Sequence, residues 1–362
     1  MKILQIINNL ETGGAEKLLV EIIPLFVKKN VKMDLLMINQ IDSPFLKQLT
    51  DKNCCEIYSL GFKSLYNPLN IFKIAKYFKS YDIIHVHLFP AQYWVVLAKI
   101  ITFSKVKLIF TEHSTSNKRI QNRAFIFFER TIYHHYSKVI CITQEVKNVL
   151  ESHIGLSDKY VVIENGVNLE NIHLANPLTK SEIHPYIDEN DKLLIQVSAF
   201  RKEKDQITLI KALQYLSENV KLILVGDGLL RHQNETMVKK MKLEHRVFFL
   251  GTRMNVPQLL KTADISILSS HWEGFGLVAV EGMAAGKPVI ASNVAGLSNV
   301  VNGSGVLFEK GNEKQLGQKI KELLDNNNLY NEVAKRCYER SKQYDINILV
   351  KKLMNLYNDL LK

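Results

Sequence analysis

Residues 273–281, which read Glu-Gly-Phe-Gly-Leu-Val-Ala-Val-Glu, decide the fold of this chain. A short apolar stretch at 263–268 precedes them, and residues 277–285 have the composition of a helix. A strand, a loop with glycines and a helix direct free backbone N–H groups and the positive helix end toward a phosphate. The stretch therefore predicts a phosphate site at a strand end, although a plain turn with two surface glutamates has the same spacing.

The two glutamates of this stretch occupy different positions. Glu281 lies about one turn inside the expected helix, so its carboxylate can reach past a bound phosphate to a sugar hydroxyl. Glu273 stays in the loop and can meet a ligand from the side. We therefore expect different roles for the two carboxylates.

Length and composition indicate a globular protein of two domains. The chain has 362 residues, of which 46% are hydrophobic and 23% charged. Residues 1–7 are too short for a signal peptide, and no apolar run approaches the roughly 20 residues that span a bilayer. We therefore expect a cytoplasmic protein.

The cysteines predict neither disulfides nor zinc. The chain contains Cys54, Cys55, Cys141 and Cys337, without a CxxC spacing or a paired His/Cys cluster. We expect reduced thiols and no bound metal.

The chain is basic, with a formal charge of +11 and an isoelectric point near 9.2. Residues 1–170 carry 21 Lys and Arg against 15 Asp and Glu, a net +6, so the excess is expected in both halves. Such a balance suits an anionic small molecule, a nucleic acid or an acidic membrane surface, and does not choose among them.

Two series of alternating strands and helices follow from the hydrophobic pattern. In the first, residues 2–7 lead to Gly13-Gly14 and an amphipathic helix, without the GxGxxG spacing of dinucleotide sites. Further strands are expected at 31–38, 56–60, 82–87, 107–113, 138–143 and 160–167. Strands rich in Val and Ile that alternate with helices predict a parallel sheet covered on both faces.

The second series begins after a polar segment. Residues 169–190 are rich in Asn, Glu, His and Pro, and we interpret them as a linker between domains 1–168 and 191–342. Strands are expected at 193–198, 221–225, 247–250, 265–268 and 288–292. Ligands of open α/β sheets bind at the carboxyl ends of the strands. We therefore expect two α/β domains that face each other across a cleft.

Three motifs together resemble a known family: the stretch 273–281, Gly13-Gly14-Ala15-Glu16 and Gly226-Asp227-Gly228. The chain resembles retaining GT-B glycosyltransferases of family 4, which include bacterial capsule, exopolysaccharide and lipopolysaccharide sugar transferases. The resemblance implies two Rossmann-like domains that clasp a nucleotide sugar, with most donor contacts in the second. It also implies that residues 343–362 cross back to the first domain, and that no metal or other cofactor is needed.

The resemblance assigns roles around the phosphate site. Glu281 would accept hydrogen bonds from the ribose hydroxyls, and Glu273 would contact the donor sugar near its transferring end. Backbone groups of Phe275, Gly276 and Leu277 would hold the diphosphate. The remaining donor contacts that it implies are Gly14 at the diphosphate, Gly226, the base-side loop Gly251, Thr252 and Arg253, and Asn165 in the cleft.

Two cations and one histidine complete the implied catalytic set. Lys204 and Arg201 would neutralise charge on the departing diphosphate. Many members carry an arginine where this chain has Ala199, so Arg201 is expected to replace it. His113 would face the donor sugar as a positioning and charge-tuning group. Retention would follow a front-face route in which the leaving phosphate helps to deprotonate the acceptor.

Acceptor selection is expected in the first domain. Residues 62–79 and 118–138 mix aromatic and basic side chains, which favours contact with the inner face of a membrane, although core helices with a solvated basic face have the same pattern. We therefore expect a glycan or lipid-linked oligosaccharide acceptor. A UDP-linked hexose or N-acetylhexosamine is the expected donor, with GDP-mannose as the second choice.

Three alternatives stay open. One is a nucleotide-sugar epimerase of the same architecture, and another is a non-catalytic partner subunit that binds a sugar nucleotide. The third is a nucleic-acid-binding protein, which the isoelectric point allows but no recognisable nucleic-acid-binding signature supports.

Overall fold

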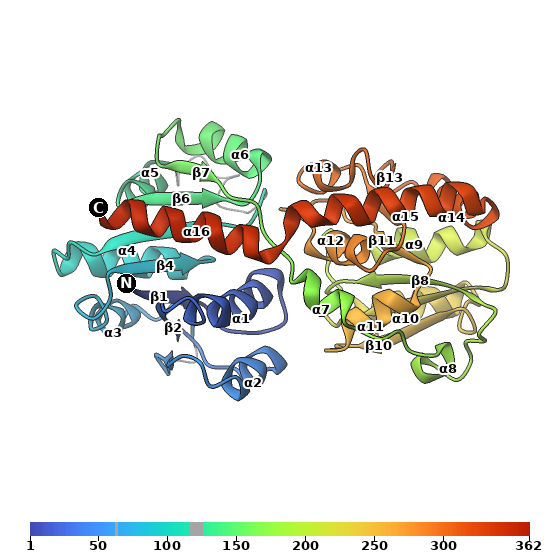
Figure 1. Cartoon of the computed structure of the whole chain (residues 1–362), viewed down its shortest axis with the longest axis horizontal. Helices are drawn as coiled ribbons and strands as arrows, with labels where there is room; N and C mark the ends of the chain where they lie inside the picture. Colours follow the sequence, from blue (N-terminus) through green and yellow to red (C-terminus); the bar gives the residue numbers. More distant parts are fainter. Residues whose placement is uncertain (62–63, 116–125) are drawn as a thin grey trace. The chain divides into compact units, whose positions relative to one another are not determined.

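The structure is a computed structural model that describes residues 1–61, 64–115 and 126–362. The chain forms two compact units, the first made of Met1–Gly166 with Ile346–Lys362 and the second of Val167–Asp345 (Figure 1). The C-terminal residues therefore belong to the first unit.

The first unit is built on a parallel sheet of seven strands in the order β3-β2-β1-β4-β5-β6-β7. The strands are β1 (Lys2–Ile7), β2 (Lys32–Met37), β3 (Ile57–Ser59), β4 (Ile83–His87), β5 (Lys107–Glu112), β6 (Lys138–Cys141) and β7 (Tyr160–Val162). The described helices are α1 (Gly14–Val27), α2 (Pro44–Asp51), α3 (Asn70–Ala75), α4 (Ala91–Ile101), α5 (Ile126–His134), α6 (Gln144–Ile154) and α16 (Ile346–Leu361).

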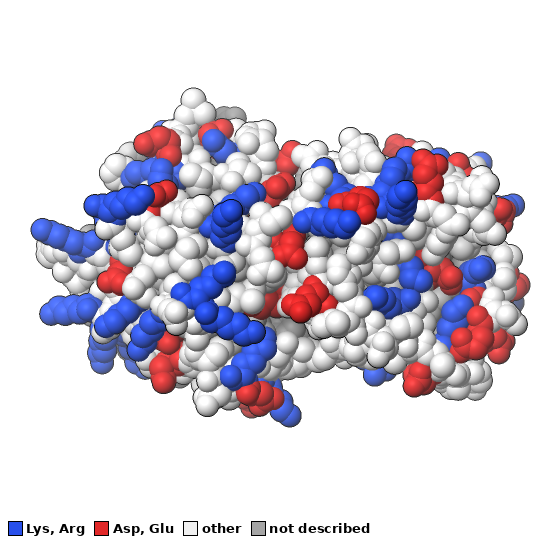
Figure 2. Space-filling view, in the orientation of Figure 1, with Lys and Arg blue, Asp and Glu red and all other residues white. Residues whose placement is uncertain are grey.

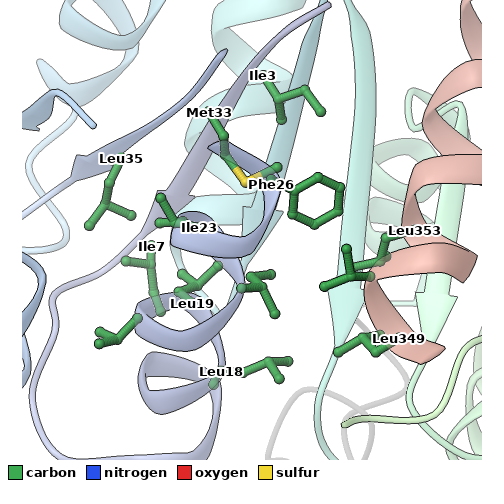
Figure 3. Packing of buried hydrophobic residues seen from close by; sticks show 14 of the residues in the cluster. Ile3, Ile7, Leu18, Leu19, Ile23, Phe26, Met33, Leu35, Leu349 and Leu353 are labelled. Carbon is green, nitrogen blue, oxygen red and sulfur yellow. The ribbon is translucent and has the colours of Figure 1, made fainter. Parts of the chain in front are cut away.

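The last helix, α16, is part of the hydrophobic core of the first unit. Leu349 and Leu353 of α16 lie in one cluster with residues of α1 and the first strands (Figure 3). Tyr357 is fully buried, and the centroid of its ring lies 5.6 Å from that of Phe26. Burying one face of α16 in this way stabilises its place in the first unit.

The second unit holds a parallel sheet of six strands in the order β10-β9-β8-β11-β12-β13. The strands are β8 (Lys192–Val197), β9 (Val220–Val225), β10 (Val247–Gly251), β11 (Ile265–Leu268), β12 (Val289–Ser292) and β13 (Val306–Phe308). The α-helices are α7 (Leu169–His173), α8 (Lys180–Ile183), α9 (Gln206–Ala212), α10 (Arg231–Lys240), α11 (Val256–Thr262), α12 (Leu277–Ala284), α13 (Leu297–Val301), α14 (Glu313–Asp325) and α15 (Asn327–Ser341).

These two sheets confirm the predicted α/β class with two Rossmann-like units. Every strand pair of both sheets is parallel, so helical connections must run from each strand to the next. No helix in the described parts of the chain is both long and apolar enough to cross a bilayer.

Residues 169–190 are not a separate linker. They contain α7 and α8 and belong to the second unit. The buried side chains of Leu169, Ile172, Ile183 and Ile187 explain this, because each buries apolar surface in that unit. Because the segment is mostly polar, its composition does not reveal that these four apolar side chains are buried.

The positive charge is not shared equally, contrary to the expectation from the two halves of the sequence. The first unit has 24 Lys and Arg against 15 Asp and Glu, a net charge of +9. The second unit has 23 against 21, a net charge of +2. Residues 1–166 already carry a net +7, and residues 346–362, with three lysines and one aspartate, add +2.

Candidate active site

The stretch 273–281 lies at the carboxyl end of β11 and runs into α12, as the sequence predicts. Gly276 is the N-cap of α12, with φ 87° and ψ 57°, a left-handed conformation that favours glycine. No side chain caps this helix start. The first N–H groups of α12 are therefore available for an anion.

Gly296 holds this turn in place. Its φ is 80°, and a Cβ there would lie 2.5 Å from the carbonyl oxygen of Glu273 and 2.8 Å from that of Gly274. The next residue, Leu297, lies against Gly276, where an added Cβ would be 2.6 Å from Leu297 Cδ1. The sequence pattern does not reveal Gly296, because its role depends on a contact with Glu273 and Gly274, more than 20 positions away.

Lys204 and Glu273 form an ion pair beside the turn. The Nζ of Lys204 lies 2.5 Å from Oε1 of Glu273, and their side chains are 23% and 12% exposed. Ser270 donates its hydroxyl to the same carboxylate oxygen at 2.9 Å. Charge-assisted hydrogen bonds of this kind fix both groups.

Two buried polar residues hydrogen-bond to the turn that carries Lys204. The Ser269 hydroxyl, with one proton to donate, lies 2.8 Å from the carbonyl of Asp205 and 3.0 Å from Oε1 of Gln196. Gln196 donates its amide to the carbonyl of Lys204 at 2.9 Å. Bonds from two strands thus orient the turn that carries Lys204, and the sequence pattern identified neither residue.

Arg201 and Ala199 lie in the loop after β8. Arg201 is exposed and precedes the short 3-10 helix Lys202–Lys204. Gln206 donates its amide to the carbonyl of Ala199 at 3.0 Å. The role of Arg201 as the second cation stays a prediction.

The glycines after β9 and β10 form close backbone contacts. A Cβ at Gly226 would lie 2.2 Å from the carbonyl oxygen of Ser198, and the Gly226 N–H donates to the Gly251 carbonyl at 2.8 Å. Thr252 and Arg253 follow as exposed residues. The loops after three neighbouring strands therefore lie together at one edge of the sheet.

Glu281 is buried on α12, with 3% of its surface exposed. Its helix neighbour Gly282 lies against Ser266 of β11, where a Cβ would be 2.7 Å from the serine Cβ and Oγ. This close approach places the first turns of α12 directly over the strand.

In the first unit, the predicted residues lie where strands and helices begin or end. Gly14 is exposed and opens α1, Asn165 is buried after β7, and His113 follows β5. His113 Nε2 lies 3.2 Å from Nδ1 of His87, whose Nε2 lies 2.9 Å from Oε1 of Gln5.

A second buried histidine extends this network to the last helix. His85 Nδ1 lies 2.7 Å from the hydroxyl of Tyr357, and its Nε2 lies 2.7 Å from the hydroxyl of Thr111. Both His85 and His87 are buried inside the unit.

All three histidines are held neutral. Burial lowers the pKa of His113 to about 4 and that of His85 to about 3. Burial, with the charges of the other two histidines, lowers the pKa of His87 well below its usual value. His113 therefore presents a neutral imidazole, which can hydrogen-bond a sugar hydroxyl without adding charge.

Family models match both units. The family described as Glycosyltransferase Family 4 matches residues 12–171, and the family described as Glycosyl transferases group 1 matches residues 180–343. An uncharacterized glycosyltransferase of Methanocaldococcus jannaschii is 32% identical over 83% of this chain and 82% of its own length. The chain belongs to the GT-B glycosyltransferases of the family 4 type.

Other relatives of this glycosyltransferase have named activities. An N-acetyl-alpha-D-glucosaminyl L-malate synthase of Bacillus anthracis is 28% identical, over 78% of this chain and 76% of its own. An Escherichia coli enzyme named UDP-Gal:alpha-D-GlcNAc-diphosphoundecaprenol alpha-1,3-galactosyltransferase is 25% identical, over 91% and 90%. The HepE protein of Anabaena, solved with UDP and glucose, has the same fold, with a TM-score of 0.87, 23% identity and 99% coverage of both chains.

Membership in the glycosyltransferases gives the geometry a chemical meaning. A nucleotide sugar carries a diphosphate, a ribose and a sugar whose bond to the phosphate is broken. The second unit offers an uncapped helix start and a half-buried cation in neighbouring loops, and a buried carboxylate one turn into α12. Among the described residues, no group of three His, Cys, Asp or Glu side chains is arranged to hold a metal ion.

Proposed function

We propose that this glycosyltransferase moves a hexosyl or N-acetylhexosaminyl group from a UDP-sugar to a glycan or lipid-linked glycan, with retention, in surface polysaccharide synthesis. The observation that carries the proposal is the Lys204–Glu273 ion pair beside the helix start that Gly276 and Gly296 shape. A diphosphate needs a cation and aligned N–H donors, and this loop cluster offers both.

In the proposed reaction, each group of the second unit has one task. Backbone N–H groups of Phe275, Gly276 and Leu277 bind the diphosphate, and Glu281 accepts hydrogen bonds from the ribose hydroxyls. Gly226, Gly251, Thr252 and Arg253 lie around the nucleotide.

Bond breaking places new negative charge on the diphosphate, and Lys204 stabilises it. The bond from the anomeric carbon to the phosphate oxygen breaks, and the acceptor oxygen bonds to that carbon on the same face. The acceptor proton passes to the departing phosphate. Glu273 orients the donor sugar and keeps Lys204 in place, and the neutral imidazole of His113 hydrogen-bonds the sugar.

We propose that no metal takes part, because Lys204, with Arg201, supplies the positive charge that a divalent cation supplies in other transferases. Turnover that is unchanged in EDTA is the expected result. A loss of turnover in EDTA that Mg²⁺ or Mn²⁺ restores would contradict this part of the proposal.

The named relatives support the donor and the acceptor. The HepE structure contains UDP and glucose, and the name of the Escherichia coli relative gives a UDP-sugar donor and a diphosphoundecaprenol-linked acceptor. Such an acceptor lies in a membrane, so we also propose a cytoplasmic enzyme at the inner membrane face. Residues 118–125 of one basic aromatic stretch and residues 62–63 of the other lie outside the described residues.

The test has two stages. Thermal-shift and calorimetric screening of UDP, GDP and their sugars identifies the donor, with UDP-sugars expected to stabilise the protein most. NMR of the product with short glycan acceptors then gives the anomeric configuration, expected to match that of the donor. Epimerised donor without acceptor would replace the proposal with an epimerase, and donor binding without any turnover would indicate a non-catalytic partner.

A further inference from the structure

The positive charge of the first unit is concentrated at one edge of its sheet. In a parallel sheet all strands begin at the same edge, and there the connections from helix to strand lie. In the first unit, six connections lead from a helix to the next strand. Together with the first residue of each strand, they contain 11 lysines and three Asp or Glu. The lysines are Lys2, Lys28, Lys29, Lys32, Lys52, Lys76, Lys79, Lys105, Lys107, Lys138 and Lys159.

The opposite edge has no such excess. Among the described residues of the strand-to-helix connections and the last strand residues there are four Asp or Glu and no Lys or Arg. The described part of the edge that bears His113 therefore has no positive excess, and the edge where strands begin carries a net +8. We call the latter the basic edge.

Strand register brings these lysines side by side. Lys2 of β1 pairs with Lys32 of β2, and Ile3 of β1 pairs with Ile83 of β4, which pairs with Lys107 of β5. Neighbouring strands are about 4.8 Å apart, so these lysines form a row. Figure 2 shows blue side chains gathered at the end of the unit where Figure 1 places the N-terminus, α3 and α4.

A hollow adjoins the basic edge. It has a volume of about 760 Å³, and five lysines from two strands and the region of α3 line it, together with Tyr58, Tyr77 and Tyr81. The lysines are Lys2, Lys32, Lys73, Lys76 and Lys79. Ammonium groups on flexible stems around such a space suit several phosphate groups.

Two apolar side chains project from the same edge. Phe103 is 90% exposed between α4 and β5, and Leu156 is 86% exposed between α6 and β7. Within the described part of the first unit these are the most exposed large hydrophobic residues. They precede β5 and β7, which are two positions apart in the sheet, and lie in connections that also contain lysines.

Phe103 occupies a position that favours a different residue. It follows the end of α4 with φ 50°, a left-handed conformation in which glycine or asparagine usually stands. Neither burial nor helix termination explains a phenylalanine there. A ligand that covers the phenyl ring would.

We propose that the basic edge docks on an anionic lipid bilayer, with Phe103 and Leu156 inserted among the headgroups. Lysines near an anionic surface and apolar side chains that enter the interface reinforce each other in peripheral proteins. A nucleic acid would use the lysines and leave isolated aliphatic tips such as Leu156 in water.

Docking at this edge constrains the acceptor, and this point rests on the proposed function. His113 follows the carboxyl end of β5 and Lys107 begins it, so the length of the strand, about 20 Å, separates the bilayer from the edge that carries His113. A lipid-linked acceptor then needs a glycan of several sugars to reach the histidine. The arrangement favours a lipid-linked oligosaccharide over a lipid-linked monosaccharide.

The experiment measures flotation of the full chain with vesicles of phosphatidylcholine alone or with 30% phosphatidylglycerol (about one anionic lipid in three), without donor or acceptor. We expect binding to the anionic vesicles only. Phe103→Gly suits the left-handed backbone and should keep the thermal stability, yet weaken binding about tenfold. Lys79→Glu with Lys105→Glu should weaken it at least tenfold.

Matched variants in the second unit distinguish a role of the basic edge from the effect of net charge or of any exposed apolar residue. Lys239→Glu with Lys240→Glu changes the net charge equally, and Leu174→Ser removes another exposed leucine. Both should bind like the unchanged protein. In Phe103→Trp, brominated lipids should quench the new fluorescence, whereas in Leu174→Trp they should not.

Three results would overturn the inference: equal binding to both vesicle types, equal loss in the two pairs of lysine variants, or binding to RNA with none to vesicles. Because no donor is present, these results are independent of glycosyl transfer. A failure of the proposed function would appear instead as absent UDP-sugar binding in protein that still floats with vesicles.

Discussion

Gly296→Ala tests whether the turn 273–276 binds the donor. The substitution adds a methyl group 2.5 Å from the Glu273 carbonyl oxygen and 2.8 Å from that of Gly274, at a residue with φ 80°. Left-handed backbone costs alanine about 1–2 kcal/mol. Crowding in a packed site costs about 1–3 kcal/mol. We therefore expect a loss of about 2–5 kcal/mol in the free energy of unfolding.

Gly296→Ala should also weaken binding of the donor. To relieve the contacts, the carbonyls of Glu273 and Gly274 must move by several tenths of an ångström, and the adjoining N–H groups of the α12 start move with them. Loss of one hydrogen bond to a charged phosphate costs about 1.5–3 kcal/mol. Binding of UDP should therefore weaken about 10- to 150-fold.

Gly286→Ala is the matched control, because Gly286 has φ 75° and an added Cβ would meet no atom within 4 Å. Gly286 lies just after α12. Its substitution should lower the free energy of unfolding only by the cost of the left-handed backbone, about 1–2 kcal/mol, and should leave UDP binding unchanged. Denaturant unfolding and calorimetric titration of UDP measure the two effects. If Gly296→Ala is destabilised but binds UDP like the unchanged protein, the turn does not hold the diphosphate.

Three further predictions concern individual side chains. Glu281→Gln should weaken UDP binding by about tenfold in calorimetry, since a neutral amide is a poorer acceptor for ribose hydroxyls; unchanged affinity would contradict the ribose role. Lys204→Met should lower kcat about 100-fold or more, with a smaller change in nucleotide affinity, because its charge acts on the leaving group; equal losses in both would indicate a ground-state role. Burial gives His85 and His87 pKa values below that of an unfolded histidine. The free energy of unfolding should therefore be highest above about pH 6.5 and fall below that pH by up to 1.4 kcal/mol per pH unit for each histidine. His85→Gln with His87→Gln should flatten this slope in urea unfolding measured from pH 8 to 5.

Much of the fold was predictable because it is written in local patterns. Runs of Val, Ile and Leu mark the strands, and the glycines between strand and helix mark the crossovers. The turn 273–281 was identified for the same reason, because all of its parts lie within nine residues. Features of this kind are formed by residues that are close in sequence, so one sequence is enough to predict them.

What the sequence did not show depends on contacts between distant residues. Gly296 contacts the Glu273 carbonyl, Ser269 hydrogen-bonds the carbonyl of Asp205 next to Lys204, and Tyr357 meets His85 across 272 positions. The linker expected at 169–190 failed for a related reason. Its few buried apolar side chains stabilise it only where the second unit packs against them.

The contrast between the two edges of the first unit shows how topology turns a diffuse composition into a surface. Lysines scattered from residue 2 to residue 159 have no pattern along the chain. In a parallel sheet every helix-to-strand connection returns to one edge, so a lysine in most of them becomes a single basic face. The strand-to-helix connections meet at the other edge, around His113, and their described residues contain no Lys or Arg. If attachment and chemistry use opposite edges, charge changes at the basic edge should alter transfer to membrane acceptors and leave transfer to short soluble glycans unchanged. Equal effects on both acceptors would mean that the lysines act on the reaction itself.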